Sequence, residues 1–547
     1  MKNNFLKLVF IFLFLACETT SIFDTKVVNK AIENGDLAHE SFKRSIDFTR
    51  AWLRKTDSQT GLIPSSLINS KIDLWDPANA AADNYPYMVL TAYLLDQKLF
   101  DGPLLDILHQ EKKLTSRLNV LPDVYSFSKR DFVEYPPNIG HIIFGASEYI
   151  KDGLIPLNEM IGESPWQERM MEMIDELHFY MEDFDNMAKY FKKASNVEEI
   201  NGEMLQTLSR VYWMTGEEKY LNWAIKIADK YFIDMDLSQI DYLKLRDHGC
   251  EIIGGLSEIY LTLHYISHPK KLNYQISLYR FLDRILVYGR NPDGLFYNAV
   301  NLKTGQLIDS RISDTWGYIL NAYYTVWIVD QKDEYKKAVL KPFKALDLKY
   351  RNYNWEPKAQ ETSNHKLNLL GSHDGYADSI ESGINLFNRL NNSYLQSWID
   401  SEINVMFGMQ KPDGIIEGWH GDGNFARTAL MYGLWKTQGA RLSPWRENLY
   451  LGAEPNGDEI YFVLKTKEAW EGKLIFDQVR HKTILNLPVD YPRINQFPEW
   501  FTLNPNLKYR IISSDKNLSG IYSGEKLLNG LTLKLSAGAI LKIAITY

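Results

Sequence analysis

Four short stretches of the sequence combine carboxylates with histidine, tryptophan or arginine, the residue types that acid–base chemistry and ligand binding require. Cleavage of a glycosidic bond needs one carboxylic acid to protonate the leaving oxygen. It also needs a carboxylate that activates water or acts as the nucleophile. Crowded acids supply both, because their mutual repulsion and their neighbours push their pKa values apart. The four stretches are residues 246–251, 311–318, 373–381 and 417–427.

The candidate catalytic carboxylates are Asp314 and Asp378 first, followed by Asp247 and Glu251. Asp247 and Glu251 are four residues apart, and Asp378 and Glu381 are three apart, so each pair is expected to share a helix face. An Asp at a helix start is also an ordinary N-cap, and Glu251 could simply bond a neighbouring helix. The spacing therefore does not decide which pair is catalytic.

A sugar ring offers C–H faces that stack on aromatic side chains. Helix N-termini and arginine attract an anionic group such as a uronate carboxylate. Aromatic residues make up 13% of the chain, although a large core accounts for most of them. The glycines of residues 417–427 let the backbone approach a ligand closely. The residues predicted to bind substrate are His141, His248, Trp316, Glu381, Trp419, His420, Asp422 and Arg427.

Metal and cofactor chemistry find little support in the sequence, and we predict neither. His264 and His268 are four residues apart, but Pro269 follows at a helix end and no third ligand is evident. The motifs of zinc proteases, serine hydrolases, phosphate loops and dinucleotide binding do not occur. Cys250 could act as a nucleophile, but a free cysteine is more often a small buried residue.

Size and charge bound the class of protein. The 547 residues include 61 Lys and Arg and 69 Asp and Glu, which gives a net charge of −8. This acidity argues against a nucleic-acid binder, which needs a basic surface. The length suits a large domain and a smaller one. The expected partner is an oligosaccharide.

Residues 1–17 resemble a bacterial lipoprotein signal. Two lysines precede an apolar run at residues 8–16, which is too short to span a bilayer, and Phe14-Leu15-Ala16-Cys17 ends it. This predicts export to the periplasm or the outer-membrane surface with a lipid on Cys17. Phe14 departs from the usual Leu, so secretion without a lipid stays open. Residues 18–36 are polar and predict a linker.

A polar signature recurs where long helices with apolar periodicity begin, about one helical hairpin apart. Stacked hairpins that close on themselves form a ring and bring their helix starts to one mouth. We therefore predict a mainly α fold, an (α/α)6 toroid of six or seven hairpins over residues 37–442. The signature occurs at Asp83, His141, Asn201, Asp247, Asp314, Asp378 and Asp422.

A second repeat and a change in the period of the apolar residues indicate the rest of the domain organisation. Gly61, Gly153, Gly294 and Gly414 each follow Asp or Thr and precede apolar residues, which predicts equivalent tight turns on one face of the ring. After about residue 443 the period becomes two, which predicts a small all-β domain, a sandwich, over residues 443–547. Its strands are expected at residues 459–464, 473–476, 508–512, 531–535 and 539–545.

The stretch Ala82-Asp83-Asn84-Tyr85-Pro86-Tyr87, the cluster Asp247-His248-Gly249 and the terminal β domain resemble those of the six-hairpin glycosidases. Within that superfamily the chain is most similar to glycoside hydrolase family 154. The resemblance covers about residues 35–547 and implies an α/α toroid and β-glucuronidase activity on plant or algal glycans. It carries no catalytic position over. The stretch Trp316-Gly317-Tyr318 also resembles the unsaturated glucuronyl hydrolases.

Together these features predict an exo-acting glycoside hydrolase that removes a uronic acid, β-glucuronic acid, from plant or algal oligosaccharides. A uronate polysaccharide lyase or an unsaturated glucuronyl hydrolase is the first alternative. A lyase would use Tyr with His or Asn to take the proton beside the uronate carboxyl, and His141, His248 and His420 keep it open. The second alternative is a glycan-binding lipoprotein without catalysis.

Overall fold

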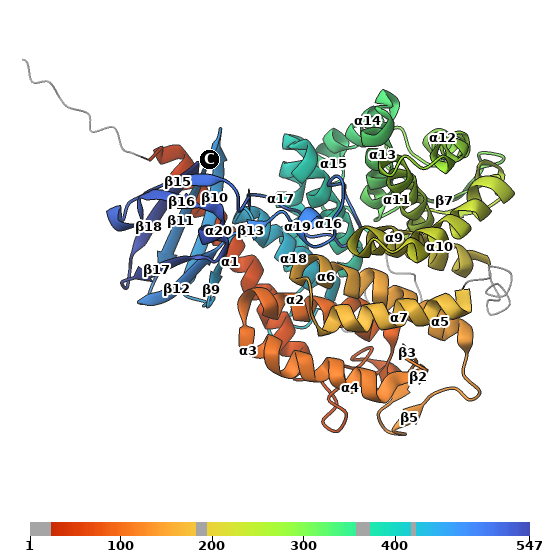
Figure 1. Cartoon of the computed structure of the whole chain (residues 1–547), viewed down its shortest axis with the longest axis horizontal. Helices are drawn as coiled ribbons and strands as arrows, with labels where there is room; N and C mark the ends of the chain where they lie inside the picture. Colours follow the sequence, from red (N-terminus) through yellow and green to blue (C-terminus); the bar gives the residue numbers. More distant parts are fainter. Residues whose placement is uncertain (1–22, 182–193, 357–371, 417–422, 547) are drawn as a thin grey trace, which may run out of the picture.

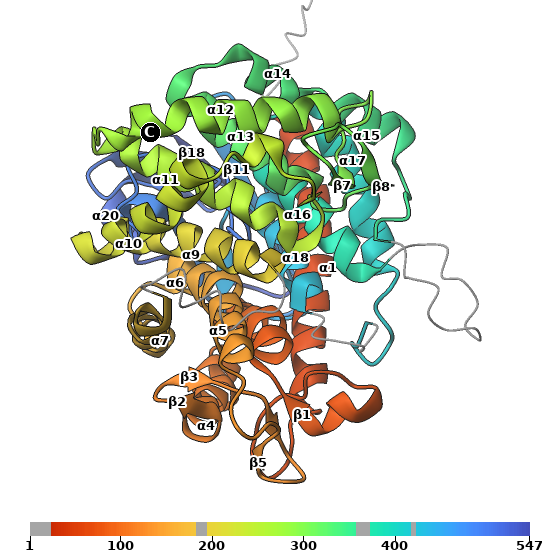
Figure 2. The ribbon, with the colours of Figure 1, turned by 90° about the vertical axis from the view of Figure 1, so that its right-hand side faces the viewer.

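Helices fill one part of the molecule and strands the other (Figure 1). The computed structural model describes residues 23–181, 194–356, 372–416 and 423–546. The helices form an α/α toroid, and a C-terminal β-sandwich follows it. The predicted fold class is confirmed. Figure 2 shows the toroid from the side opposite the sandwich, whose strands lie behind it.

The inner helices follow one another around the ring. Contacts join α9 to α11, α11 to α13, α13 to α16, α16 to α18 and α18 to α2. The π-helical turns η2 (Pro77–Asn84) and η4 (Tyr149–Leu154) connect α2 to α5, which contacts α9. In the described ranges the ring thus closes with seven inner helices, which favours seven hairpins over six. They are α2 (Tyr85–Leu95), α5 (Ile139–Glu148), α9 (Ala194–Thr215), α11 (Glu251–Tyr265), α13 (Trp316–Asp330), α16 (His373–Leu390) and α18 (Gly423–Lys436).

The outer helices cover the inner ones with one apolar stripe each. In α10 the stripe is Tyr220, Trp223, Ala224 and Ile227, at the spacing of one helical face. The inner helix α18 is buried along its whole length, because it has neighbours on both sides. The outer helices are α1 (Thr25–Leu53), α4 (Leu105–Thr115), α7 (Pro165–Met181), α10 (Glu218–Asp229), α12 (Lys270–Tyr288), α14 (Asp333–Leu340), α15 (Phe343–Lys349) and α17 (Ser393–Phe407).

Helix α1 joins the two parts of the molecule. It begins at Thr25, inside the stretch expected to be a linker, and Asp24 caps it by accepting from the backbone N–H groups of residues 26 and 27. Its first half packs on the sandwich, and its second half contacts α18 and α2. A Cβ at Gly452 would lie 2.0 Å from the carbonyl oxygen of Ala31, so this glycine is what lets the helix approach the sheet. The prediction of a linker rested on polar composition alone, and from Thr25 onward these residues are helical.

The sandwich has a five-stranded sheet in the order β10-β11-β18-β15-β16 and a three-stranded sheet in the order β17-β12-β9. Phe462 and Ile543 of the first sheet and Leu474 and Leu533 of the second share one hydrophobic core. All five expected strands are present. The strands are β9 (Arg441–Ser443), β10 (Leu449–Asn456), β11 (Glu459–Thr466), β12 (Trp470–Ile475), β15 (Lys508–Ser513), β16 (Gly520–Ser523), β17 (Leu531–Leu535) and β18 (Ile540–Thr546).

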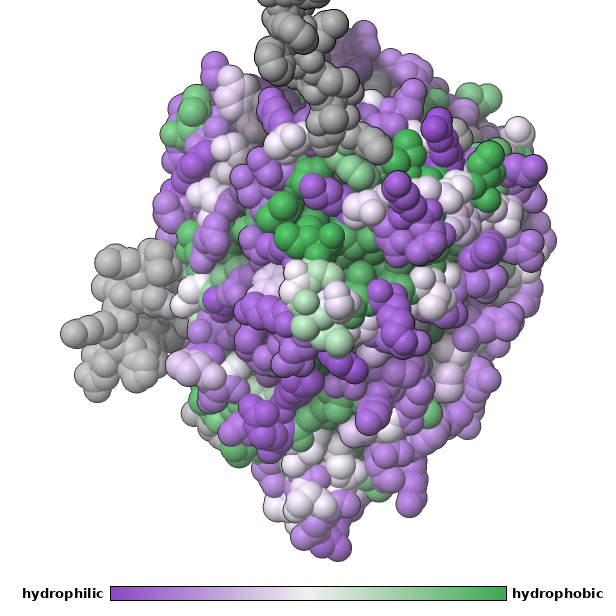
Figure 3. Space-filling view, turned by 90° about the vertical axis from the view of Figure 1, so that its left-hand side faces the viewer, coloured by the Kyte–Doolittle hydropathy of each residue, from purple (hydrophilic) through white to green (hydrophobic). Residues whose placement is uncertain are grey.

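The outer face of the sandwich is largely hydrophilic, with apolar side chains gathered near its middle (Figure 3). Among the described residues, no helix combines the length and the apolar character needed to cross a membrane.

Three of the four expected glycine turns are present. Gly61, Gly294 and Gly414 have φ values of 74°, 98° and 94°, which only glycine adopts readily. The prediction is wrong for Gly153, which lies in the π-helical η4. There a Cβ would lie 2.6 Å from Cγ of Pro86, so close packing and not a turn requires the glycine.

Residues 479–500, which we call the C-terminal segment, leave the sandwich between β13 (Asp477–Gln478) and β14 (Thr502–Leu503). Their apolar side chains belong to the core of the toroid and not to that of the sandwich. The segment thus lies in the helical part, although the chain position suggested the β domain. The buried apolar residues are Leu485, Leu487, Tyr491, Ile494 and Phe497.

Candidate functional site

The starts of several inner helices lie side by side at one end of the ring. Ser379 Oγ donates to the carbonyl oxygen of Asp314 at 2.8 Å, which joins the starts of α16 and α13. Thr428 Oγ1 donates to the carbonyl oxygen of Ala377 at 3.0 Å, which joins α18 to α16. Because these contacts link neighbours around the ring, polar side chains from distant parts of the sequence meet there.

A small sheet that the sequence did not predict positions two of the acids. Strands β6 (Leu243–Lys244) and β8 (Leu307–Ile312) both pair with β7 (Tyr297–Val300), and Asp247 follows β6 while Asp314 follows β8. The side chains of Ser313 and Thr315 donate to the carbonyl oxygen of Leu245 at 3.3 and 3.0 Å. The two loops are thereby held together.

Asp314 is the most strongly perturbed acid of the site. Its residue is 5% exposed, and its Oδ1 accepts from the backbone N–H of Thr315 at 3.0 Å. Burial raises its pKa well above the usual value, and the charges of Glu356, Asp378 and Asp247 raise it further, while Arg246 opposes them. We call Asp247, Asp314, Glu356, Asp374 and Asp378 the acid group. A carboxyl whose pKa is raised in this way keeps its proton to a higher pH than usual, as a general acid must.

Glu356 was not predicted as a site residue. Burial raises its pKa to about 7, and the charge of Asp374 adds to the effect. Its Oε1 lies 3.6 Å from Arg246 Nη2, and Lys244 Nζ lies 2.8 Å from Asp247 Oδ2. Glu356 and Asp247 have φ values of 47° and 51°, a left-handed conformation that costs energy in residues other than glycine and that clusters at functional sites.

Asp378 lies between a cation and a phenol. Arg427 Nη2 donates to Asp378 Oδ1 at 2.8 Å, and Tyr318 Oη donates to the same oxygen at 3.1 Å. Burial raises the pKa of Asp378 to about 6, Asp374 adds to the rise and Arg427 opposes it. Arg427 also donates to Asn424, which in turn donates to Asp374 at 2.6 Å. Asp378 is thus ionised at neutral pH, as a base or nucleophile requires.

Glu251 does not face the acid group. Lys151 Nζ lies 2.5 Å from Glu251 Oε1, and Gln206 donates to Oε2. The expectation of a shared helix face is wrong, because the α-helix begins at Glu251 while Asp247 opens a 3₁₀ turn with left-handed backbone. An ion-paired, buried carboxylate of this kind holds elements together.

The other predicted residues take varied positions. Glu381 is fully buried one turn below Asp378 and accepts from Asn385 Nδ2 at 2.8 Å. Trp316 is fully buried with its ring 5.7 Å from that of Trp398, so it offers no face to a sugar. His141 is exposed at the start of α5. Outside the described residues lie Trp419, His420, Asp422, Cys17 and the side chain of His248.

One further cluster has the composition of a cation site. Glu148, Asp152 and Glu203 are buried, and oxygens from all three lie within 4.8 Å of one another. Lys151 Nζ lies 2.8 Å from Asp152 Oδ1 and already supplies a positive charge. Repulsion by Glu203 and Asp152 adds to burial in raising the pKa of Glu148.

Two cavities lie away from the acid group. One of about 450 Å³ is lined by Tyr93 to Lys98 and Arg441, at the far end of α2 from its polar start. The other, of about 550 Å³, adjoins Arg50, Leu99 and Ile107. Neither lining contains a residue of the acid group.

No protein-family profile matches this chain, and no curated protein matches its sequence. Similar solved structures include an inactive variant of the α-1,6-mannanase GH76A of a Salegentibacter species, with TM-score 0.39 and 11% identity over 73% of this chain and 98% of that one. A glycosyl hydrolase family 88 protein from Bacteroides vulgatus has TM-score 0.39 and 10% identity over 53% and 89%. The cellobiose 2-epimerase from Bacillus thermoamylovorans has TM-score 0.37 and 11% identity over 59% and 89%. At these values the similarity assigns neither a family nor an activity to this chain.

Proposed function

We propose that this chain is a carbohydrate-active enzyme, and more closely an exo-acting glycoside hydrolase that removes β-glucuronic acid from plant or algal oligosaccharides. The observation that carries the proposal is the acid group, in which Asp314, Glu356 and Asp378 all have raised pKa values. Buried carboxyls with shifted pKa values and few matching cations are typical of acid–base sites. A protein that only binds glycans has no need of them.

In the proposed reaction, Asp314 donates its proton to the glycosidic oxygen as the bond to the anomeric carbon breaks. Asp378 is the carboxylate on the other side of the bond. It either takes a proton from the water that attacks the anomeric carbon or attacks that carbon itself, and water then releases the sugar. Both routes add one water across the bond.

A uronate carboxylate suits the cations beside the acid group. The side chains of Lys244 and Arg246 are each about one third exposed, at 29% and 30%, and lie next to Asp247 and Glu356. Arg246 can make paired hydrogen bonds to a carboxylate. These two residues support a uronic acid over a neutral sugar.

One observation argues against the lyase alternative. A tyrosine that abstracts the proton beside a uronate needs a pKa below its usual value. Tyr318 lies against Asp378, and burial raises its pKa well above that value. This favours hydrolysis over elimination by Tyr318. An unsaturated glucuronyl hydrolase would use the same carboxyls on another substrate.

The test is incubation of the purified full chain with aryl β-glucuronides and uronate-capped oligosaccharides, with products separated and weighed by mass spectrometry. We expect release of a saturated uronic acid with the gain of one water. An absorbing, unsaturated product would establish a lyase instead. Absence of turnover on every uronate substrate would refute the proposal, and loss of turnover in Asp314→Asn would tie activity to the acid group.

We also propose export of the chain and lipid attachment at Cys17. The N-terminal sequence supports this. Cells fed a labelled fatty acid should label the wild type and not Cys17→Ala, and an unlabelled wild type would refute the attachment.

A further inference from the structure

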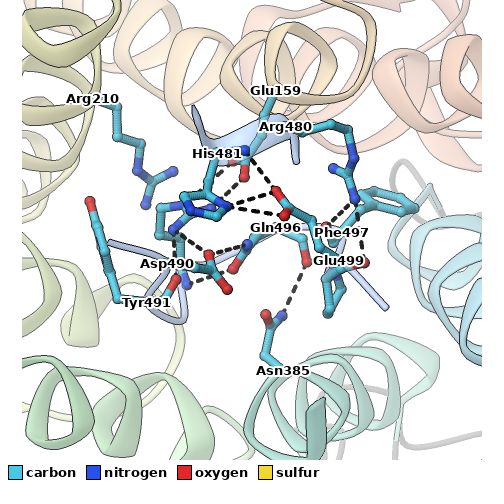
Figure 4. A network of polar contacts seen from close by, with 12 residues as sticks. Glu159, Arg210, Asn385, Arg480, His481, Asp490, Tyr491, Gln496, Phe497 and Glu499 are labelled. Carbon is cyan, nitrogen blue, oxygen red and sulfur yellow. Dashed lines mark hydrogen bonds and ion pairs between the residues drawn. The ribbon is translucent and has the colours of Figure 1, made fainter. Parts of the chain in front are cut away.

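The C-terminal segment is held in the toroid by ion pairs (Figure 4). Arg493 pairs with Glu159 of α6 (Ile155–Ile161) at 2.5 Å, and neither side chain is more than 3% exposed. Arg389 of α16 pairs with Asp490 at 2.7 Å. Within the segment, Arg480 donates to the carbonyl oxygen of Phe497 at 2.9 Å, which ties its two ends together. A segment anchored at several points can present one residue to the centre of the ring in a defined position.

That residue is Asn495, whose backbone N–H and side-chain amide are both hydrogen-bonded. Its backbone N–H donates to Glu381 Oε1 at 3.1 Å. Its Oδ1 accepts from Arg427 Nη1 at 2.6 Å, and its Nδ2 donates to Asp152 Oδ1 at 2.8 Å. It is 3% exposed and has a φ of 62°, a conformation that asparagine tolerates better than most residues. Such a satisfied, strained contact is costly to replace.

Arg427 is the residue that this contact acts on. Its Nη2 binds Asp378, while its Nη1 is shared between Asn495 and Asn424, at 2.6 and 3.0 Å. The guanidinium group is planar, so fixing one nitrogen orients the other. Without the amide oxygen of Asn495, Nη1 would keep a single neutral acceptor.

We propose that Asn495, carried into the toroid by the C-terminal segment, is a positioning residue that orients the guanidinium of Arg427 against Asp378. A segment that leaves the β domain and enters the toroid would thus contribute to the site without touching the substrate. This inference rests on the proposed role of Asp378. It goes beyond that role, because it assigns a function to a part of the chain outside the ring helices.

The position of Arg427 matters for protonation. Several charged or titratable groups face Asp378, and among them Arg427 is the cation that opposes the rise in its pKa. A loosened Arg427 stabilises the ionised form less, so the pKa of Asp378 rises further, by about one unit. The groups are Asp374 and Glu381 on α16, Tyr318 on α13, Asp314 before α13 and Arg427 on α18.

Asn495→Gly tests the inference, because glycine keeps the left-handed backbone and removes only the amide. Asn486→Gly is a matched control: Asn486 lies on the same segment with a φ of 53°, is exposed, and donates only to the carbonyl oxygen of Met214. Asn495→Asp is a second variant that tolerates the same backbone. Its carboxylate would compete with Asp378 for Arg427, so its effect should be at least as large.

Two readouts on the full chain separate this inference from the proposed function. The acidic limb of kcat/KM on a cleaved uronate substrate should move up by about one pH unit in Asn495→Gly and stay in place in Asn486→Gly. The melting temperature, which needs no turnover, reports the same ionisation. Because the pKa of Asp378 is raised from 3.8 to about 6, stability is greatest while the carboxyl is protonated and falls as the pH rises through that interval.

In Asn495→Gly the fall in melting temperature should extend about one pH unit further than in the control. Folded Asn495→Gly and Asn495→Asp proteins whose pH dependences match that of Asn486→Gly would overturn the inference. A wild type without turnover would refute the proposed function, and the melting curves would still decide the role of Asn495. A merely structural residue would lower the melting temperature equally at every pH.

Discussion

Asp314 and Asp490 are two shielded carboxyls with opposite electrostatics. Burial raises the pKa of Asp314, and the charges of three further acids raise it again. Among the main contributors, only Arg246 lowers it. Around Asp490, on the C-terminal segment, burial would also raise the pKa, but Arg389 and Arg493 outweigh it and the pKa lies below its usual value. Asp490 is the more exposed of the two, with 24% of its side chain accessible, but the supply of cations sets the direction of its pKa shift.

This difference separates two kinds of polar cluster in one toroid. In the C-terminal segment and its neighbours, arginines match the carboxylates, as in the pairs Arg493–Glu159 and Arg210–Glu258. Buried ion pairs of this kind fix geometry but contribute little net stability. In the acid group the carboxylates outnumber the nearby cations, which is unfavourable for folding and useful for proton transfer. The variants below test this contrast, from the largest expected effect to the smallest.

The largest effect is expected from Asp314→Asn. The amide keeps the acceptor for the N–H of Thr315 but has no proton to donate, so kcat should fall about 100- to 10,000-fold. Stability should change little, because burial and the neighbouring acids already disfavour the charged form of Asp314 and the amide that replaces it is neutral. Steady-state kinetics and thermal unfolding measure the two. Asp490→Asn is the control, and we expect this variant to keep its turnover and to lose stability. Equal turnover in the two variants would contradict the contrast between the two carboxyls.

Arg493→Met should have the largest effect on stability alone. It leaves the Glu159 carboxylate buried without its partner, and Asp490 loses one of its two arginines. Breaking a buried pair from one side costs about 3–5 kcal/mol. Urea unfolding measures the loss. The double variant Glu159→Met with Arg493→Met should recover part of it, and a single variant as stable as the wild type would show that the pair is not buried in solution.

Glu356→Gln should change the pH dependence of stability. The pKa of Glu356 is raised from 4.5 to about 7, so the wild type is more stable while this carboxyl is protonated and loses stability as the pH rises through that interval. The glutamine variant has no such loss, and at pH 8 its free energy of unfolding should exceed that of the wild type by on the order of 2 kcal/mol. At pH 4.5 the difference should be much smaller. Parallel stability curves would show that Glu356 is already ionised in solvent.

The smallest effect is expected from Lys244→Ala. Its pair with Asp247 is partly exposed, with side-chain exposures of 29% and 38%. Such a pair contributes at most about 1 kcal/mol, and added salt weakens it. Melting curves at low and high salt check this. A loss well above that value, independent of salt, would place Lys244 among the matched, buried pairs.

Helical periodicity and the recurring polar starts were enough to predict the ring and the strands of the sandwich. They also pointed to Asp247, Asp314, Asp378 and Arg427, which the structure brings together, because equivalent positions of a repeat converge in space; their catalytic and binding roles stay predictions. Asp247 and Glu251 show the limit of spacing arguments. Asp247 is itself left-handed and opens a 3₁₀ turn, so the α-helix begins only at Glu251, and no feature of the sequence marks that conformation.

Glu356 and Asn495 could not be predicted for a similar reason. Glu356 stands in a loop without periodicity, and it belongs to none of the four acid-rich stretches. The C-terminal segment reads as irregular chain between strands, so its insertion into the toroid depends on contacts distant in sequence. Its charged residues, Arg480, Asp490 and Arg493, were the available sign that it meets a polar partner.

The pH profile of kcat/KM for the wild type tests the central claim most directly. If the acid group performs acid–base catalysis, activity should fall below the pKa of about 6 for Asp378. It should fall again at higher pH, as the proton donor Asp314, whose pKa is raised well above its usual value, ionises. We expect a bell-shaped profile whose acidic limb lies near pH 6. A profile that is flat from pH 5 to pH 8, or that rises continuously toward alkaline pH, would contradict the account.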